Sequence, residues 1–220
     1  MCFKKIFGNN NPAMQKVELR TVTLGRNKYG SGNDLAGCVK DSKSLASFCT
    51  AWNPAFDIRM FLDYQVTAQN YLKAGAEAIS LLDPGATVLV LLDSCFSGTA
   101  TRLMKGNPHP VKNRFYDPGK PFVQKLRSRV AKADKINWIA ISACMENQTA
   151  ADAYIDGGYC GAFTYYALKS LRKGMTYIEW YQTIRGFLPG NGYDQAPTID
   201  GPYELVNRKV FEGQTLVIHN

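Results

Sequence analysis

The stretch Ala86–Thr99, ATVLVLLDSCFSGT, decides the fold class of this chain. Its first seven residues are apolar or β-branched without interruption, which is typical of a strand covered on both faces in a parallel sheet. The stretch continues into Asp93 and Cys95, and a second apolar run, Ile136–Ala143, also ends in small and polar residues. Because the carboxyl ends of parallel strands meet at one edge of a sheet, we expect the two endings to frame one cleft.

Further strand and helix patterns alternate on either side of this stretch. Strands are expected at Val17–Leu24 and Asp57–Leu62, and helices at Ala36–Cys49, Thr67–Leu82, Gly161–Arg172 and Thr176–Leu188, with Thr67 as a candidate N-cap. This alternation predicts an α/β fold with a mostly parallel central sheet and helices on both faces. We expect residues 1–14 to form a flexible arm and residues 15–220 to form a single domain, since single domains run to roughly 250 residues.

The composition excludes several classes of protein. With 220 residues, of which 45% are hydrophobic and 20% charged, the chain is neither disordered nor fibrous. No apolar run approaches the ~20 residues of a membrane span, and the N-terminus lacks the apolar stretch of a signal peptide. The six cysteines include no CxxC pair and are interpreted as reduced thiols, which favours a cytoplasmic location. With two histidines and no short Cys/His spacing, we expect no metal and no cofactor.

The net charge of +8 is confined to one segment. Residues 102–135 hold ten Lys or Arg residues and two acids, whereas the rest of the chain has equal numbers of bases and acids. Basic residues alone give only salt-sensitive, non-specific binding to nucleic acid, and the segment has few aromatic residues for base stacking. We therefore disfavour nucleic acid as a partner and interpret the segment as a basic connection between two strands.

Cys95 is the first candidate catalytic residue. A thiol at the carboxyl edge of a sheet lies beside backbone amides that could bind an oxyanion. A second interpretation stays open at this point, because free cysteines are among the most buried residue types and Cys95 could be structural. Cys144, near the end of the second apolar run, is interpreted as structural.

Five motifs, in order along the chain, resemble those of metacaspases and related caspase-like cysteine peptidases. Asp93–Gly98, DSCFSG, resembles their nucleophile block, Asp-Ser-Cys-x-Ser-Gly. The other four are DLAGCVKD, with Lys40 where Asn is usual, then SACMENQTAADA, GAFT and QAP, at Asp34–Asp41, Ser142–Ala153, Gly161–Thr164 and Gln195–Pro197. Together they span most of residues 17–200.

The resemblance implies a caspase-like α/β sandwich in which Cys95 is the nucleophile and forms a thioester with a peptide carbonyl carbon. It also implies that Asp93 and Asp41 line the pocket for the side chain before the scissile bond, where two carboxylates would select Lys or Arg. The partner would be a peptide or protein substrate, bound by a monomer and without a membrane. For Asp41 the sequence also allows a solvated acid on a helix, flanked by Lys40 and Lys43.

The histidine that the resemblance requires is not present before Cys95. In this family it lies in a Tyr-Ser-Gly-His-Gly-type block at the end of the preceding strand, where it lowers the thiol pKa and protonates the leaving amine. Ala76–Val90 matches the helix, turn and strand that lead into that block, and Leu91–Cys95 follows directly. We therefore interpret the block as absent, with two strands merged into one, and expect no calcium site.

Three explanations of this gap stay open. The chain is a homologue without the base, or it is shortened relative to an active parent, or His109 replaces the missing residue. His109 lies 14 residues after Cys95, and an extended segment of that length spans ~45 Å, but its place between two prolines favours a solvated side chain. His219 is penultimate and is expected to be frayed.

Two functions therefore remain for the chain. The first is a cysteine endopeptidase that cleaves after Lys or Arg through Cys95, with self-processing within residues 102–135. The second is an inactive pseudopeptidase that binds peptides or partner proteins through the acidic cleft.

Overall fold

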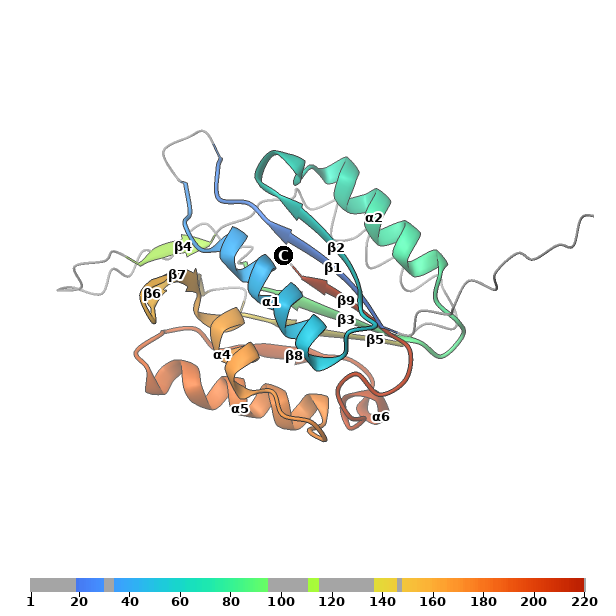
Figure 1. The fold of residues 1–220 in the computed structure, drawn as a ribbon. Coiled ribbons are helices and arrows are strands. Elements are labelled where there is room, and N and C mark those ends of the chain that lie inside the picture. The colour runs from blue at the N-terminus through green and yellow to red at the C-terminus, as the bar shows by residue number, and fades with distance from the viewer. Residues whose placement is uncertain (1–18, 30–33, 95–110, 115–136, 146–147, 220) are drawn as a thin grey trace, which may run out of the picture.

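The computed structural model describes residues 19–29, 34–94, 111–114, 137–145 and 148–219. Its centre is a six-stranded sheet with the order β2-β1-β9-β3-β5-β8 (Figure 1). These strands are β1 (Leu19–Gly25), β2 (Asp57–Leu62), β3 (Thr87–Leu92), β5 (Asn137–Ser142), β8 (Thr198–Asp200) and β9 (Thr215–His219). All neighbours are parallel except β8, which pairs with β5 in the antiparallel direction.

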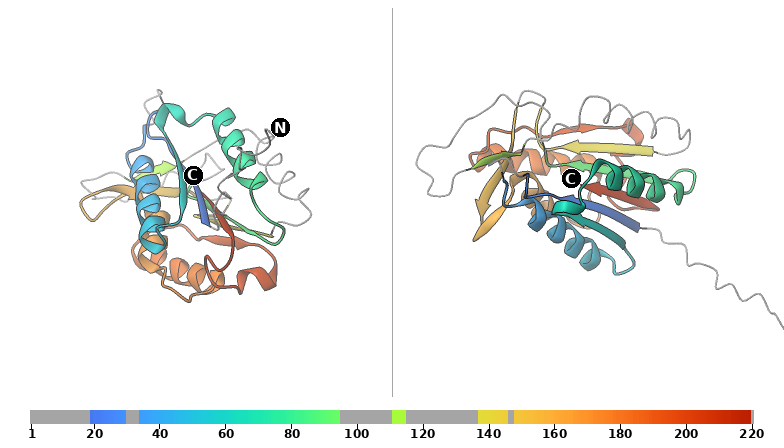
Figure 2. Two further views of the ribbon diagram at one scale, coloured as in Figure 1. Left: turned by 45° about the vertical axis from the view of Figure 1, so that its right-hand side comes forward. Right: turned by 90° about the horizontal axis from the view of Figure 1, so that it is seen from above.

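Helices cover both faces of this sheet (Figures 1 and 2). On one face lie α1 (Cys38–Trp52), α4 (Ala162–Ser170) and α5 (Tyr177–Gly190), and on the other α2 (Ala68–Ser80); η1 (Asp63–Gln65) and α6 (Tyr203–Val206) are single turns. Leu89 packs in the larger apolar cluster with α1, α4 and α5, whereas its neighbour Val88 packs in the smaller cluster with α2. Successive side chains of β3 thus face opposite layers, as expected for a strand covered on both sides.

A second, antiparallel sheet lies beside the carboxyl ends of the parallel strands (Figure 1). It has the order β4-β6-β7, with β4 (Lys112–Arg114), β6 (Ala150–Ile155) and β7 (Gly158–Gly161). Gly161 ends β7 and is also the N-cap of α4. This small sheet therefore joins the basic connection to the helix layer at the edge where the sequence places the cleft.

The main predictions of the fold are confirmed. The structure is a mixed α/β domain with a mostly parallel central sheet, which is compatible with a caspase-like fold. Asp57–Leu62 is a strand with the predicted bounds, and the Thr67 hydroxyl accepts a hydrogen bond from the Asn70 amide, 3.1 Å away, as the N-cap of α2. The expected arm, residues 1–14, and all of the basic connection 102–135 except residues 111–114 lie outside the described residues.

The strand between β1 and β3 is β9, the last along the chain. His219 is in register with Thr23 on one side and with Leu91 on the other. The sequence analysis interprets two strands of the family as merged into one, which would leave a position beside β3 without a strand. β9, from the C-terminal part of the chain, fills that position. The expectation that His219 is frayed is wrong, because this side chain is only 1% exposed.

Within the described ranges, no helix has both the length and the hydropathy that a membrane crossing needs.

Candidate active site: an acidic pocket that holds an arginine

The structure brings Asp41 and Asp93 together around one guanidinium group, that of Arg114. Asp41 lies in the first turn of α1, Asp93 directly follows β3, and Arg114 is the last residue of β4. Arg114 Nη1 lies 3.1 Å from Asp93 Oδ2, and its Nη2 contacts Asp41 Oδ2. A third carboxylate, that of Asp152 in β6, lies 2.9 Å from Nη2. We call these three acids and Arg114 the acidic pocket.

The pocket is closed to solvent in this structure. None of the four side chains is more than 3% exposed. The alternative interpretation of Asp41 as a solvated helix acid is therefore wrong. A buried charge is tolerated only when it is paired and hydrogen-bonded, so the arrangement of backbone donors around the three acids matters.

Backbone N–H groups from two segments hold Asp41 and Asp152 in place. The amide of Gly161 donates to Asp41 Oδ2 at 2.8 Å. The amides of Ala36 and Gly37 donate to the two oxygens of Asp152 at 2.8 and 3.1 Å. Charge-assisted hydrogen bonds of this kind fix the position of a carboxylate.

Two of the motif glycines are explained by this packing. A Cβ atom on Gly161 would lie 1.9 Å from Asp93 Oδ2 and 2.5 Å from Arg114 Nη1. A Cβ on Gly37 would lie 2.3 Å from Asp152 Oδ1. Both positions therefore exclude any side chain, because the backbone itself forms the wall of the pocket.

Burial and charge oppose each other in the pocket. Burial raises the pKa of Asp41 to about 6, while Arg114 acts in the opposite direction. Burial also raises the pKa of Asp93, against Arg114 and the hydrogen bonds from Thr164. For Arg114, burial disfavours the charge, but Asp41 and the other acids outweigh it and raise the pKa well above its usual value. The arginine therefore stays charged, and the pocket has more acids than it needs to neutralise one cation.

His219 is joined to the pocket through a hydrogen-bonded chain. The Thr164 hydroxyl donates to Asp93 Oδ2 at 2.6 Å, so its oxygen accepts from His219 Nε2 at 2.9 Å. His219 Nδ1 then carries no proton and accepts from the Thr23 hydroxyl at 3.1 Å. Burial, with a smaller effect of Arg114, lowers the pKa of His219 to about 3. This imidazole is neutral and has a partner at each nitrogen.

The predicted nucleophile Cys95 and the alternative base His109 lie outside the described residues. Two other thiols adjoin the pocket, and burial raises the pKa of both Cys38 and Cys160 to about 12. These two remain protonated at neutral pH and are poor nucleophiles. Cys144, which the sequence analysis interprets as structural, lies two residues after β5 and is 8% exposed.

Sequence reasoning did not assign a role to Asp152, Thr164, Arg114 or His219. Asp152 and Thr164 stand inside two of the quoted motifs, so the motifs contained the signal for them. Arg114 is one of ten bases in its segment and has no local feature that distinguishes it. His219 gains its place through the pairing of β9 with β1 and β3, which no local pattern shows.

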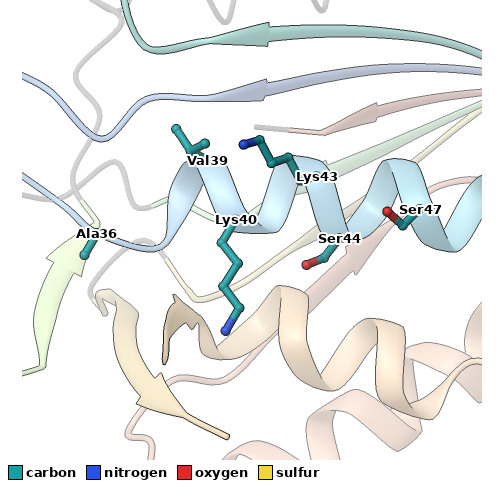
Figure 3. A pocket seen from close by; sticks show the side chains of 6 residues that line it. All are labelled: Ala36, Val39, Lys40, Lys43, Ser44 and Ser47. Carbon is teal, nitrogen blue, oxygen red and sulfur yellow. The ribbon is translucent and has the colours of Figure 1, made fainter. Parts of the chain in front are cut away.

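A separate hollow, of ≈ 690 Å³, lies on the outer side of α1 (Figure 3). Its walls carry Lys40 and Lys43, and Ala36, Val39, Ser44 and Ser47 complete the lining. Two ammonium groups would repel a Lys or Arg side chain, so we do not assign substrate recognition to this hollow. Within the described ranges, no group of three or more His, Cys, Asp or Glu side chains has an arrangement that could hold a metal ion.

Comparison with known proteins points to the same family as the motifs. No family model matches the chain. It is 25% identical to Metacaspase-1 of Lodderomyces elongisporus over 146 residues, which are 66% of this chain and 31% of that protein. It is 32% identical to Metacaspase-1 of Cryptococcus neoformans var. neoformans serotype D over 92 residues, which are 40% of this chain and 19% of that protein. The matches thus span less than a third of the length of these curated relatives and suggest a caspase-like family at low identity.

A solved structure supports the fold independently. Protein GSU0716 from Geobacter sulfurreducens has a TM-score of 0.60 with this chain at 17% identity, over 88% of this chain and 98% of that one. At this level of identity the likeness concerns the fold alone.

Proposed function

We propose that this chain is a caspase-like cysteine endopeptidase that cleaves after Lys or Arg. The observation that carries the proposal is the acidic pocket, in which three buried carboxylates surround an arginine side chain. Asp93 of this pocket precedes Cys95 by two residues in the sequence. A basic side chain bound there would bring the carbonyl that follows it close to the thiol, and such positioning is a large part of enzymatic rate enhancement.

The proposed reaction has two steps. The Cys95 sulfur attacks the carbonyl carbon after the basic residue, the C–N bond breaks, and the amine leaves with the proton that the thiol gives up. Water then hydrolyses the thioester, which releases a carboxylic acid and restores the thiol. Asp41, Asp93 and Asp152 bind the basic side chain throughout, and the pocket selects Lys or Arg through charge pairing.

A thiol-reactive peptide ketone with arginine next to its reactive group tests this proposal. We expect one covalent adduct per chain, lost in Cys95→Ala and retained in Cys38→Ala, because the Cys38 thiol remains protonated. A matched probe with citrulline, which has the shape of arginine without its charge, is expected to label slowly. Labelling that survives Cys95→Ala, or that ignores the change to citrulline, contradicts the assigned nucleophile or the assigned specificity. Intact mass measures both.

A second candidate is peptide binding without catalysis. The observation that favours it is the state of His219, which is neutral, buried and hydrogen-bonded to Thr23 and Thr164. Both ring nitrogens of His219 already have hydrogen-bond partners, and burial disfavours the imidazolium ion that a general base would become. Covalent labelling by the arginine probe without cleavage of Lys or Arg peptides would support the binding function over the peptidase.

A further inference from the structure

The side chain in the acidic pocket comes from the chain's own basic connection. Arg114 makes three ion pairs there and is 2% exposed. Its strand, β4, is the edge strand of the small sheet and pairs with β6 in the antiparallel direction, with Arg114 opposite Ala150 and Lys112 opposite Asp152. An extended segment added to a sheet edge, with one side chain in a pocket, is the general mode in which peptides bind to strands.

Arg114 and the acids around it leave some of their buried polar atoms without hydrogen bonds in the described part of the chain, unlike a permanent structural cluster. Within the described residues, Arg114 Nε and Asp93 Oδ1 are buried without a hydrogen-bond partner. In native protein interiors nearly all buried polar groups have a hydrogen-bond partner. The pocket also holds three carboxylates against one guanidinium, which is an excess of acid for a fixed ion pair. Both features suit a site that holds an exchangeable cationic ligand.

We propose that β4 with Arg114 is an internal ligand of the acidic pocket, which occupies the place of a substrate's basic side chain until an external Lys or Arg peptide displaces it. The inference rests on the proposed function for the class of ligand, but it concerns binding and not the chemical step. An internal ligand lowers the apparent affinity for an external one by the fraction of molecules in which the pocket is open. Removal of Arg114 should therefore tighten the binding of an arginine peptide.

The test uses a fluorescein-labelled tripeptide amide that ends in arginine, with all chains carrying Cys95→Ala so that no cleavage takes place. We expect Arg114→Gln to lower the dissociation constant about tenfold or more, since the site is then open in most molecules. Lys112→Gln is the matched control, because it removes the same charge from the same strand at an exposed residue that contacts the Asp34 carbonyl outside the pocket. The Lys112→Gln chain should bind the arginine peptide with the same affinity as the chain that carries Cys95→Ala alone.

A citrulline peptide is the ligand control and should bind none of the three chains. The inference is overturned if Arg114→Gln folds and binds the arginine peptide no more tightly than Lys112→Gln does. Because this experiment measures binding alone, a failure of the proposed peptidase shows instead as missing Cys95-dependent labelling in chains that retain Cys95.

Arg114→Gln leaves three acids without their cation and can therefore lose its fold. In that case ethylguanidinium is added, since it carries the missing group without the chain. Recovery of cooperative thermal unfolding by ethylguanidinium, and not by an equal concentration of sodium chloride, supports a pocket whose cation is exchangeable. Failure of ethylguanidinium to restore the fold would make Arg114 a fixed structural residue and would overturn the inference.

Discussion

Among single residues, Asp41 makes the charge of the pocket depend on pH. Burial raises its pKa from 3.8 to about 6, so the folded state binds this proton more tightly than the unfolded state. The resulting stabilisation is full below pH 3.8 and is lost as the pH rises through about 6. Asn cannot titrate, so the free energy of unfolding of the Asp41→Asn variant should fall less across that pH range than that of the unchanged chain. Urea titrations at several pH values measure it, and parallel curves for the two chains would contradict the burial argument.

His219 acts in the opposite direction. Burial lowers its pKa from 6.5 to about 3, so its contribution to stability is present above pH 6.5 and is lost as the pH falls through about 3. We expect His219→Gln to resist acid better than the unchanged chain, because an amide can donate to Thr164 and accept from Thr23 without taking up a proton. Tryptophan fluorescence against pH measures this. Equal acid midpoints for the two chains would show that His219 titrates outside the folded core.

The junction of β7 and α4 is the element on which the pocket depends most. Gly161→Ala would place its methyl group against Asp93 and Arg114, and overpacking of this kind costs about 1–3 kcal/mol. Gly186→Ala is the matched control, because Gly186 lies in α5 and a Cβ there meets nothing within 4 Å. We expect the control to gain about 1 kcal/mol from helix propensity. Thermal unfolding compares them, and similar shifts for both variants would contradict the close approach at Gly161.

The elements that the sequence predicted are those with a pattern of their own. β3 and β5 are continuous apolar runs, and α2 has both a capping threonine and an apolar face. Sequence reasoning missed the short strands β4, β6, β7, β8 and β9. β4 and β8 have three residues each, β6 is AADAYI and β7 is GYCG, so none of these four is a continuous apolar run. β9, TLVIH, is mostly apolar but has only five residues. β9 becomes a central strand because it pairs with both β1 and β3, and Thr23 of β1 lies 196 residues before His219 of β9.

The candidate site shows the same division between local and distant information. Asp41 and Asp93 follow from motifs at the ends of predicted elements, and the structure brings both to one place. Arg114 could not be singled out, because its selection among ten bases depends on the pairing of β4 with β6. The absence of a histidine before Cys95 was visible in the sequence, whereas the strand that fills the position beside β3 was not.

At the scale of the whole molecule, the net charge of +8 and the acidic pocket belong to one arrangement. The excess positive charge lies in residues 102–135, and Lys112 and Arg114 are the bases of that segment which the structure describes. Lys112 donates a hydrogen bond to the backbone carbonyl of Asp34, and Arg114 pairs with the Asp41 carboxylate. A basic connection is attracted to an acidic site of the same chain, so the charge pattern favours an interaction within the molecule over one with nucleic acid.

This arrangement predicts where the chain would cut itself. If Cys95 acts as proposed, the bond after Arg114 is the one that follows the side chain in the pocket, and purified protein should release a fragment that begins at Phe115. Arg114→Gln and Cys95→Ala are expected to abolish this cut, whereas Lys112→Gln keeps it. The rate should not change with protein concentration, because the pocket and the segment belong to one chain. Intact mass and N-terminal sequencing over time measure the cut. A fragment that begins after another of the ten bases, with Arg114→Gln having no effect, would mean that β4 lies in the pocket without being presented to the thiol.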